Sequence, residues 1–254
     1  MTRIAVTGAT GTMGATVLDV AAERDDVSTV LACTRSGTLD RALTTVRPAA
    51  IASALVDAEV DALIDFTVPE ASLAAVEAAA NAGCAAVIGT TGFDGGAERD
   101  LAAAADEIPI LVAANFSRGM EALRAALEAA LVRLPAADVE ITETHHNRKR
   151  DAPSGTALTL VEDVEAVRPD ANRVHGRVGE APRSDAEIGV HARRAGTVRG
   201  EHEVLLGGEE ETIRLTHCAG SRRIFATGAL DAAVWLAGRP PGSYAFGEVV
   251  ADAA

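Results

Sequence analysis

Near the start of the chain stands the stretch Ile4-Ala5-Val6-Thr7-Gly8-Ala9-Thr10-Gly11-Thr12-Met13-Gly14. Its apolar beginning predicts a buried strand, and the apolar positions between residues 17 and 21 predict a helix. A strand, a glycine-rich turn and a helix in this order form the context of a dinucleotide-binding fingerprint. In this context Gly8 permits the tight turn, Gly11 lets a pyrophosphate approach the backbone, and Gly14 allows close helix–strand packing. The spacing is G-x-x-G-x-x-G rather than G-x-G-x-x-G, so the prediction rests on context more than on the glycines.

A second predicted strand, residues 29–33, ends at Thr34, Arg35 and Ser36. In a parallel sheet this end lies beside the adenosine ribose of a bound dinucleotide, where NAD-preferring sites typically carry an Asp or Glu. Two hydroxyls and a guanidinium suit a 2′-phosphate instead. We therefore expect NADPH to be preferred over NADH, with Arg35 as the main contact. The alternative is a solvated arginine at a strand end.

Three more strands are predicted at residues 62–66, 86–88 and 110–112, and each ends in small or hydroxyl-bearing residues. Ligands of open parallel sheets bind at the carboxyl ends of the strands. These ends therefore offer a nicotinamide site, whose candidate residues are Gly89, Thr90, Thr91, Ala113, Ala114, Asn115 and Phe116. Taken singly, each of them also fits ordinary turn chemistry.

The pattern changes after residue 117, which indicates a second domain. Helices are predicted over 120–134 and from Ser154 onward, strands over 139–143, 188–192, 200–206, 211–217 and 224–227, a long loop over 173–189, and a last helix over 229–236. The expected fold class is α/β. A Rossmann-like parallel-sheet domain at 1–117 is completed by 222–254, and a smaller α+β domain with a mixed sheet at 118–221 serves substrate binding and oligomerisation.

The chemically densest window is residues 143–157, which contains the adjacent His145 and His146. Of the 23 basic residues all but one are Arg, and the single Lys, Lys149, lies in this window between two arginines. Arginine stays protonated, whereas neighbouring cations or burial lower a lysine pKa until it exchanges a proton. The window therefore predicts proton chemistry.

The same window opens the predicted helix at Ser154, Gly155 and Thr156. The first N–H groups of a helix have no internal partner and lie at the positive end of its dipole, so they favour a carboxylate or phosphate. The alternative is a surface loop with solvated cations and an ordinary Ser N-cap.

The composition is that of a globular protein and disfavours several kinds of partner. The 254 residues are 48% hydrophobic and 24% charged, as in a globular chain, and the net charge of −14 disfavours nucleic acid or an anionic membrane as partner. No apolar run approaches the roughly 20 residues of a membrane-spanning helix. Acidic, Lys-poor composition with 3% aromatics is similar to that of proteins from salt-loving organisms, so we predict loss of activity on desalting.

The three cysteines, Cys33, Cys84 and Cys218, are scattered and form no C-x-x-C pair. This usage is typical of reduced, buried thiols in a cytoplasmic protein. The chain begins directly with a predicted strand, so no signal peptide is expected.

These motifs together resemble the 4-hydroxy-tetrahydrodipicolinate reductase family, also called dihydrodipicolinate reductases. The likeness runs nearly end to end, and the arrangement H-H-x-x-K-x-D-A-P-S-G-T-A from His145 to Ala157 is its most specific part. It implies NAD(P)H-dependent reduction of 4-hydroxy-tetrahydrodipicolinate to tetrahydrodipicolinate, with loss of water, in lysine biosynthesis via diaminopimelate. It also implies a cytoplasmic homotetramer, assembled through the sheets of the second domain, that acts on a small dicarboxylate.

The resemblance implies roles for single residues. His145 is the acid/base and Lys149 a proton donor, while His146, Gly155 and Thr156 hold the substrate together with Ser154. Cofactor binding falls to Gly8, Ala9, Thr10, Gly11, Thr12, Met13, Thr34, Arg35 and the candidate nicotinamide residues. Thr34 stands where many relatives carry an acidic residue. This departure favours NADPH, with use of NADH left open; no metal is implied.

Other classes fit less well. A short-chain dehydrogenase needs Y-x-x-x-K, which cannot occur because the single Tyr is Tyr244 and the single Lys is Lys149. Metal-dependent hydrolysis is disfavoured because adjacent histidines lack the H-x-x-x-H spacing of two ligands on one helix face. A non-catalytic NADPH-binding redox sensor would not need the proton donors of the dense window.

Overall fold

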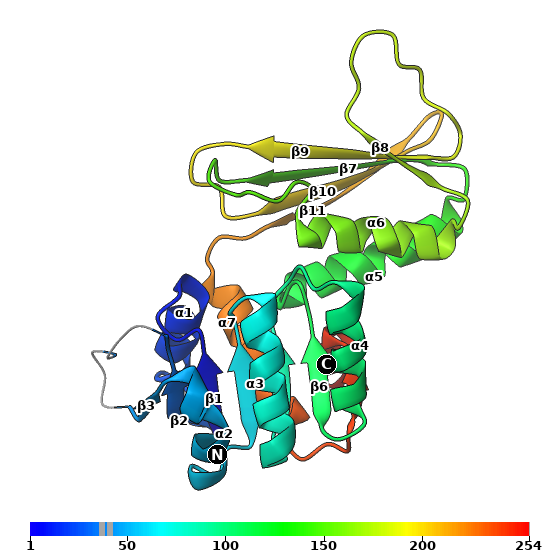
Figure 1. Cartoon of the computed structure of the whole chain (residues 1–254). Coiled ribbons are helices and arrows are strands. Elements are labelled where there is room, and N and C mark those ends of the chain that lie inside the picture. Colours follow the sequence, from blue (N-terminus) through cyan, green and yellow to red (C-terminus); the bar gives the residue numbers. More distant parts are fainter. Residues whose placement is uncertain (36–38, 40–42, 254) are drawn as a thin grey trace. The chain divides into compact units, whose positions relative to one another are not determined.

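The computed structural model describes residues 1–35, 39 and 43–253. These residues form two compact units, Met1–Ser117 with Arg222–Ala254, and Arg118–Ser221 (Figure 1). We call them unit 1 and unit 2.

Unit 1 is built on a parallel sheet of seven described strands in the order β12-β6-β5-β4-β1-β2-β3. The strands are β1 (Thr2–Thr7), β2 (Val27–Cys33), β3 (Thr45–Val46), β4 (Ala62–Asp65), β5 (Ala85–Ile88), β6 (Pro109–Val112) and β12 (Gly242–Tyr244). All four residues of β4 and of β5 are buried. Strand β5 is apolar throughout and β4 is apolar up to its last residue, Asp65, because helices cover both faces of a parallel sheet.

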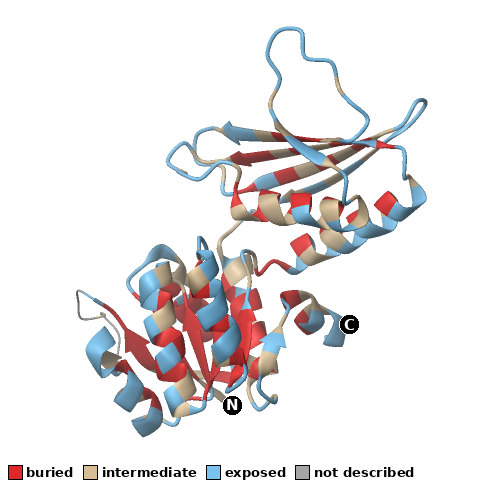
Figure 2. Ribbon diagram, turned by 45° about the vertical axis from the view of Figure 1, so that its right-hand side comes forward, coloured by how far each residue is buried: buried red, intermediate tan, exposed pale blue. Residues whose placement is uncertain are grey.

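The helices of unit 1 fall into two layers. One apolar cluster joins the sheet to α1 (Thr12–Ala21), α7 (Arg223–Leu236) and α8 (Phe246–Asp252). The other joins the opposite face to α2 (Ile51–Asp57), α3 (Pro69–Ala82) and α4 (Gly95–Ala105); a short 3-10 turn, Pro48–Ala50, precedes α2. The sandwich is visible in Figure 2, where the buried sheet lies between helices that are exposed on their outer sides. The predicted Rossmann-like sheet is confirmed.

Unit 2 has a mixed sheet of five described strands in the order β11-β10-β7-β9-β8. Its elements are α5 (Arg118–Arg133), β7 (Asp138–His145), α6 (Gly155–Val167), β8 (Asn172–His175), β9 (Glu187–Arg194), β10 (Glu201–Gly207) and β11 (Thr212–Cys218). Strand β7 runs parallel to β9 and antiparallel to β10. Alternate apolar side chains of the sheet pack with α5 and α6, as the period of two requires.

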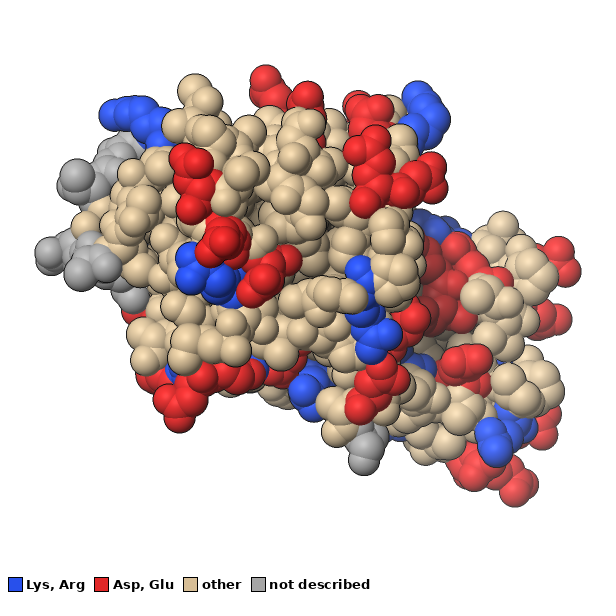
Figure 3. All heavy atoms as spheres, turned by 90° about the horizontal axis from the view of Figure 1, so that it is seen from below, with Lys and Arg blue, Asp and Glu red and all other residues tan. Residues whose placement is uncertain are grey.

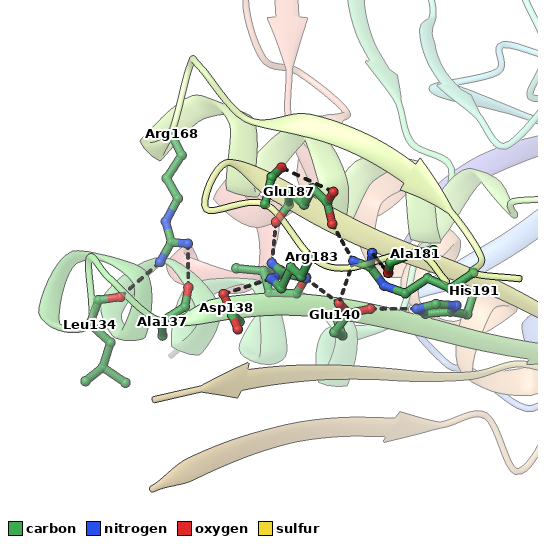
Figure 4. A network of polar contacts seen from close by, with 12 residues as sticks. Leu134, Ala137, Asp138, Glu140, Arg168, Ala181, Arg183, Glu187 and His191 are labelled. Carbon is green, nitrogen blue, oxygen red and sulfur yellow. Dashed lines mark hydrogen bonds and ion pairs between the residues drawn. The ribbon is translucent and has the colours of Figure 1, made fainter. Parts of the chain in front are cut away.

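The segment between β8 and β9 is tied to the sheet by charged groups (Figure 4). Glu140 of β7 accepts hydrogen bonds from Arg183 and from Nε2 of His191, and Glu187 accepts one from Arg177. Glu140 is one of the β7 side chains that alternate with the buried apolar residues of that strand.

Three predictions of local structure were wrong. Residues 224–227, expected as a strand, belong to helix α7, because Ala226, Ala229, Leu230 and Ala233 recur at helical spacing and are buried together. The loop expected over 173–189 begins as strand β8, which pairs with β9. Cys218 is exposed, whereas Cys33 and Cys84 are buried and free as predicted.

Within the described residues, no helix combines the length and the apolarity that crossing a membrane requires.

Candidate active site

The glycine turn between β1 and α1 has the geometry that its sequence predicts. Gly8 has φ +68°, and a Cβ at this position would lie 2.4 Å from the carbonyl oxygen of Phe66. A Cβ on Gly14 would lie 2.2 Å from the carbonyl oxygen of Gly8. Both positions therefore need glycine. Gly11 is the N-cap of α1 and makes no side-chain cap, so the first N–H groups of that helix remain open to an anion.

A pocket of about 320 Å³ opens beside this turn. Its walls come from the carboxyl ends of β1, β2 and β4 and from α2 and α3, and the residues that line it are Thr7, Gly8, Thr10, Gly11, Cys33, Thr34, Arg35, Pro48, Ile51, Phe66, Thr67, Val68, Ala71, Ala74 and Ala75. Thr10, Gly11, Thr34 and Arg35, predicted from separate motifs, thus line one cavity. Ala9 is buried in the core instead, and Thr12 and Met13 begin helix α1.

One end of the pocket is shaped by contacts between the residues that follow β1, β2 and β3. The hydroxyls of Thr10 and Thr34 lie 3.1 Å apart. Arg47 donates from Nη1 to the carbonyl oxygen of Arg35 at 2.7 Å and so fixes the backbone of that residue. Arg47 could not be singled out from the sequence, because this contact joins residues that follow two different strands. Ser36 lies outside the described residues.

A buried carboxylate joins three strand ends of unit 1. Asp65 of β4 is fully buried and accepts hydrogen bonds from the hydroxyls of Thr7 at 2.5 Å, Thr67 at 2.8 Å and Thr90 at 2.6 Å. Thr90 Oγ1 also accepts from the backbone N–H of Thr67 at 2.9 Å. Thr90, a predicted cofactor residue, therefore has its hydroxyl engaged inside the protein.

The other predicted nicotinamide residues also lie at strand ends. Gly89 and Thr91 follow β5, and Ala113 and Ala114 follow β6. A Cβ on Gly89 would lie 2.1 Å from the ring of Phe66. Phe116 is buried, with its ring centroid 6.0 Å from that of Phe66 and 5.3 Å from that of Phe246. Its side chain is thus part of the core. Asn115 Oδ1 accepts from the N–H of Ser117.

In unit 2, His145 is the last residue of β7 and is held by Glu143 on the same strand. Its Nδ1 lies 2.5 Å from Oε2 of Glu143, a side chain that is fully buried. Arg194 of β9 donates from Nη1 and Nη2 to the two oxygens of Glu143, both at 2.8 Å. The backbone N–H of Ser154 donates to Oε1 at 3.1 Å. Glu143 thus joins β7, β9 and the start of α6.

Burial and charge set the protonation of this group. Burial raises the pKa of Glu143, but the hydrogen bonds from Arg194 and His145 outweigh it, and the net pKa is lowered. Burial lowers the pKa of His145, the Glu143 carboxylate opposes this, and Lys149 and Arg194 lower it further. At neutral pH the pair is therefore a carboxylate beside a neutral imidazole that is able to accept a proton.

His202 lies on β10, the neighbour of β7 on the side opposite to β9. It is buried, its ring centroid is 5.2 Å from that of His145, and its Nε2 is 3.2 Å from Oγ of Ser154. Burial, followed by the nearby His145, lowers the pKa of His202 to about 3. Ser154 is the N-cap of α6 and its Oγ accepts from the N–H of Ala157 at 3.2 Å, so the predicted helix start is confirmed.

The remaining predicted residues lie around this group. Lys149 Nζ is 2.8 Å from Oδ2 of Asp151, and Lys149 is close enough to His145 to lower its pKa. Nδ1 of His146 is buried and makes no hydrogen bond with any described residue. Gly155 and Thr156 are the first two residues of α6. The described residues contain no cluster of His, Cys, Asp or Glu side chains placed to bind a metal ion.

Four residues of this site received no role from the sequence: Glu143, Arg194, Gly200 and His202. For Glu143 the sequence contains a signal, the i, i+2 spacing from His145 on a predicted strand, which places both side chains on the same face. The register of the sheet places Arg194 and His202 in the site, because Arg194 pairs with His145 and His202 pairs with Glu143.

Two family models match the chain, the N-terminal part of dihydrodipicolinate reductase over residues 2–116 and its C-terminal part over residues 119–250. The chain is 48% identical over 250 residues to the 4-hydroxy-tetrahydrodipicolinate reductase of Haloarcula marismortui, covering 98% of this chain and 99% of that protein. It is 50% identical over 248 residues to the enzyme of the same name from Natronomonas pharaonis, covering 97% and 99%.

Among solved structures, the fold is similar to that of the dipicolinate-bound dihydrodipicolinate reductase from Paenisporosarcina sp. TG-14. The TM-score is 0.79 at 24% identity, and the match covers 96% of this chain and 97% of that one. An amine dehydrogenase from Mycobacterium smegmatis matches with a TM-score of 0.69 at 13% identity, covering 97% and 95%.

Proposed function

The chain belongs to the dihydrodipicolinate reductase family, and we propose that it reduces 4-hydroxy-tetrahydrodipicolinate to tetrahydrodipicolinate, with loss of water, in the diaminopimelate route to lysine. The observation that carries this proposal is the grouping in unit 2 of His145, Lys149 and the start of α6 around Glu143. This grouping joins a proton-exchanging imidazole to an anion-binding helix terminus, as a dicarboxylate substrate requires.

Unit 1 fits a nicotinamide dinucleotide. A side chain on Gly8 or Gly14 would collide with backbone, and the open first turn of α1 beside the pocket suits a pyrophosphate. Gly8 to Met13, Thr34 and Arg35 would hold the adenosine side, and Gly89 to Thr91 with Ala113 to Phe116 the nicotinamide side. When bound, the reduced cofactor supplies a hydride to C4 of the substrate.

The preferred cofactor in this proposal is NADPH, with NADH accepted less well. The pocket is lined by Arg35 and Thr34 at the end of β2, and neither carries the negative charge that would hold a ribose 2′-hydroxyl and repel a 2′-phosphate. Arg47 supports Arg35 through its backbone carbonyl.

Unit 2 handles the substrate and its protons. The N–H groups at the start of α6, with Ser154, Gly155, Thr156 and His146, bind the carboxylates, and Lys149 adds positive charge. In the loss of water, His145 takes a proton from C3 while the C4 hydroxyl leaves as water with a proton from Lys149; after reduction at C4, His145 returns the proton to C3. As reduction proceeds, negative charge spreads through the conjugated imine, and the cation and the helix terminus stabilise it.

We further propose a cytoplasmic homotetramer that assembles through the sheet of unit 2. The helices α5 and α6 cover the apolar side of this sheet, whereas the alternate residues of β10 and β11 are partly or fully exposed in the single chain. A second sheet packed on this side would complete the layer.

The test is oxidation of NADPH or NADH in about 2 M salt, with substrate formed in situ from pyruvate and aspartate semialdehyde by its synthase. We expect oxidation that requires the synthase and is faster with NADPH. A folded protein that oxidises neither cofactor would overturn the proposed reaction. Size-exclusion chromatography with light scattering tests the tetramer separately.

A further inference from the structure

The carboxylate of Glu143 has every acceptor position filled. Oε1 accepts from the N–H of Ser154 and from Nη2 of Arg194, and Oε2 from Nδ1 of His145 and Nη1 of Arg194. A carboxylate offers about four lone-pair positions. No part of this side chain is exposed.

Burying a charged carboxylate such as that of Glu143 destabilises the folded state unless it is fully paired, and strand β7 does not need a charged residue at this position to fold. The preceding residues on the same face of β7, Val139 and Ile141, are buried and apolar. A buried ion pair adds little stability compared with apolar residues of similar volume. The position of Glu143 in this row therefore indicates a role other than stability.

One consequence concerns the tautomer of His145. Because Glu143 accepts a hydrogen bond from Nδ1, that nitrogen carries the proton and the neutral ring presents the lone pair of Nε2. Gly200 lies beside this nitrogen: its φ is +152°, and a Cβ there would be 3.1 Å from Nε2 of His145. The absence of a side chain at Gly200 leaves room at the nitrogen that exchanges the proton.

The second consequence is that Glu143 fixes the position of His145 relative to the start of α6. The oxygen that accepts from Ser154 belongs to the same carboxylate that holds His145, so one rigid group links the acid/base to the start of α6. His202 holds the Oγ of the same Ser154 from the neighbouring strand. A change at Glu143 would therefore alter both the imidazole and the helix terminus.

We propose that Glu143, clamped by Arg194, is a positioning residue that fixes the tautomer of His145 and sets its place relative to the substrate-binding start of α6. This inference rests on the proposed function, in which His145 exchanges the proton. The charged and titratable groups around the imidazole are Glu143 of β7, Arg194 of β9, His202 of β10 and Lys149 of the loop.

The decisive variant is Glu143→Gln. Its amide keeps the size of the side chain but removes the negative charge and can donate to Nδ1, which selects the wrong tautomer. We expect kcat to fall by about a hundredfold or more. With two cations left unopposed, the apparent pKa on the acid side of the kcat/KM profile should also fall.

The matched control is Glu140→Gln on the same strand. Glu140 also bonds an arginine and a histidine, Arg183 and His191 (Figure 4), but these contacts do not include His145. We expect kcat and the pH profile to stay within about twofold of wild type. NADPH affinity should be unchanged in both variants, since neither lies in unit 1.

Arg194→Lys serves as a second variant in case the first does not fold. Lysine keeps the charge but loses the two-pronged hydrogen bond, so kcat should fall by about tenfold or more. Wild-type kcat and pH profile in folded Glu143→Gln, or in Arg194→Lys if the first variant is unfolded, would overturn the proposal.

¹⁵N NMR of the imidazole separates this inference from the proposed function. In the wild type we expect the signal of a protonated Nδ1 and an unprotonated Nε2 for His145, and loss of that pattern in Glu143→Gln. If the wild type oxidises neither cofactor, the proposed reaction fails while the NMR result still decides the role of Glu143. The same tautomer in both proteins would refute it.

Discussion

His202 is the residue whose ionisation differs most clearly from that of the free amino acid, since its folded pKa is about 3. In an unfolded chain an imidazole titrates near about 6.5. Between these values the unfolded state binds more protons than the folded state, so this residue makes stability rise with pH across the window and fall on acidification. Burial is the main cause, and the nearby His145 adds to it.

We therefore expect the free energy of unfolding to fall between pH 7 and pH 5, and to fall less in His202→Gln. Glutamine can still donate to Oγ of Ser154 but does not titrate. Urea unfolding of both proteins at the two pH values gives the difference, while the acidic groups act equally in each. Equal pH dependence in the two proteins would show that His202 is not the source.

Arg35 is the residue on which the proposed preference for NADPH rests. Arg35→Ala removes the guanidinium from the pocket wall, and a hydrogen bond to a charged group contributes about 1.5 to 3 kcal/mol. The ratio of kcat/KM for NADPH to that for NADH should drop by about tenfold or more. NADH kinetics are the internal control, because NADH carries no 2′-phosphate. An unchanged ratio would place recognition elsewhere.

Among the elements of unit 1, the β1–α1 turn leaves no room for a side chain at Gly8 or Gly14. Gly8→Ala should lower both stability and NADPH affinity, since a Cβ would lie 2.4 Å from the carbonyl oxygen of Phe66. Gly83→Ala is a matched control. It has the same φ of +68°, but a Cβ there would meet no atom within 4 Å.

The control should show the cost of the backbone conformation alone, about 1 to 2 kcal/mol. Gly8→Ala should exceed it and should also weaken NADPH binding, whereas Gly83→Ala should leave binding unchanged. Thermal unfolding and fluorescence titration with NADPH measure the two effects. Equal losses of stability, with normal binding in both, would contradict the close approach at Gly8.

Elements with strong local signals were predictable from sequence. The strand–turn–helix at Gly8 and the capped start of α6 at Ser154 both follow from residues that are neighbours in the chain. Residues 224–227 misled the prediction because β-branched and aromatic side chains favour a strand locally, while the packing of Ala226 and Leu230 favours a helix. Short edge strands such as β12, three residues long, carry too little pattern to be recognised.

The site residues likewise divide into those with a local sequence signal and those placed by contacts between distant segments. His145, Lys149 and Ser154 lie within ten residues and were recognised as a window, whereas Arg194 and His202 reach it through the register of β9 and β10 against β7. Register depends on which strands pair, and pairing is determined by the hydrophobic patterns and turns of all the strands in the sheet. The bond from Arg47 to the Arg35 carbonyl was hidden for the same reason.

The net charge of −14 on the complete chain predicts that activity and stability depend on salt. Figure 3 shows Asp and Glu side chains spread over the face that it displays, with Arg groups among them. Such charges repel over about 30 Å at 0.01 M salt but over only about 3 Å at 1 M.

We expect activity and the midpoint of thermal unfolding to fall on dialysis from about 2 M to about 0.01 M KCl, because screening is lost. Restoring the salt should restore both if unfolding is reversible. Sucrose at matched osmolality is the control for excluded-solute effects. Full activity and an unchanged midpoint at low salt would contradict the prediction.

We propose that unit 1 binds the cofactor while residues 143–157 of unit 2 perform the proton chemistry. This division is tested by measuring kcat together with the Kd of NADPH for wild type, His145→Gln and Lys149→Met. We predict that kcat falls by about a hundredfold or more in both variants, the range for loss of general acid–base catalysis, while Kd stays within about twofold. Parallel losses of kcat and NADPH binding, or variants as active as wild type, would contradict this division of labour.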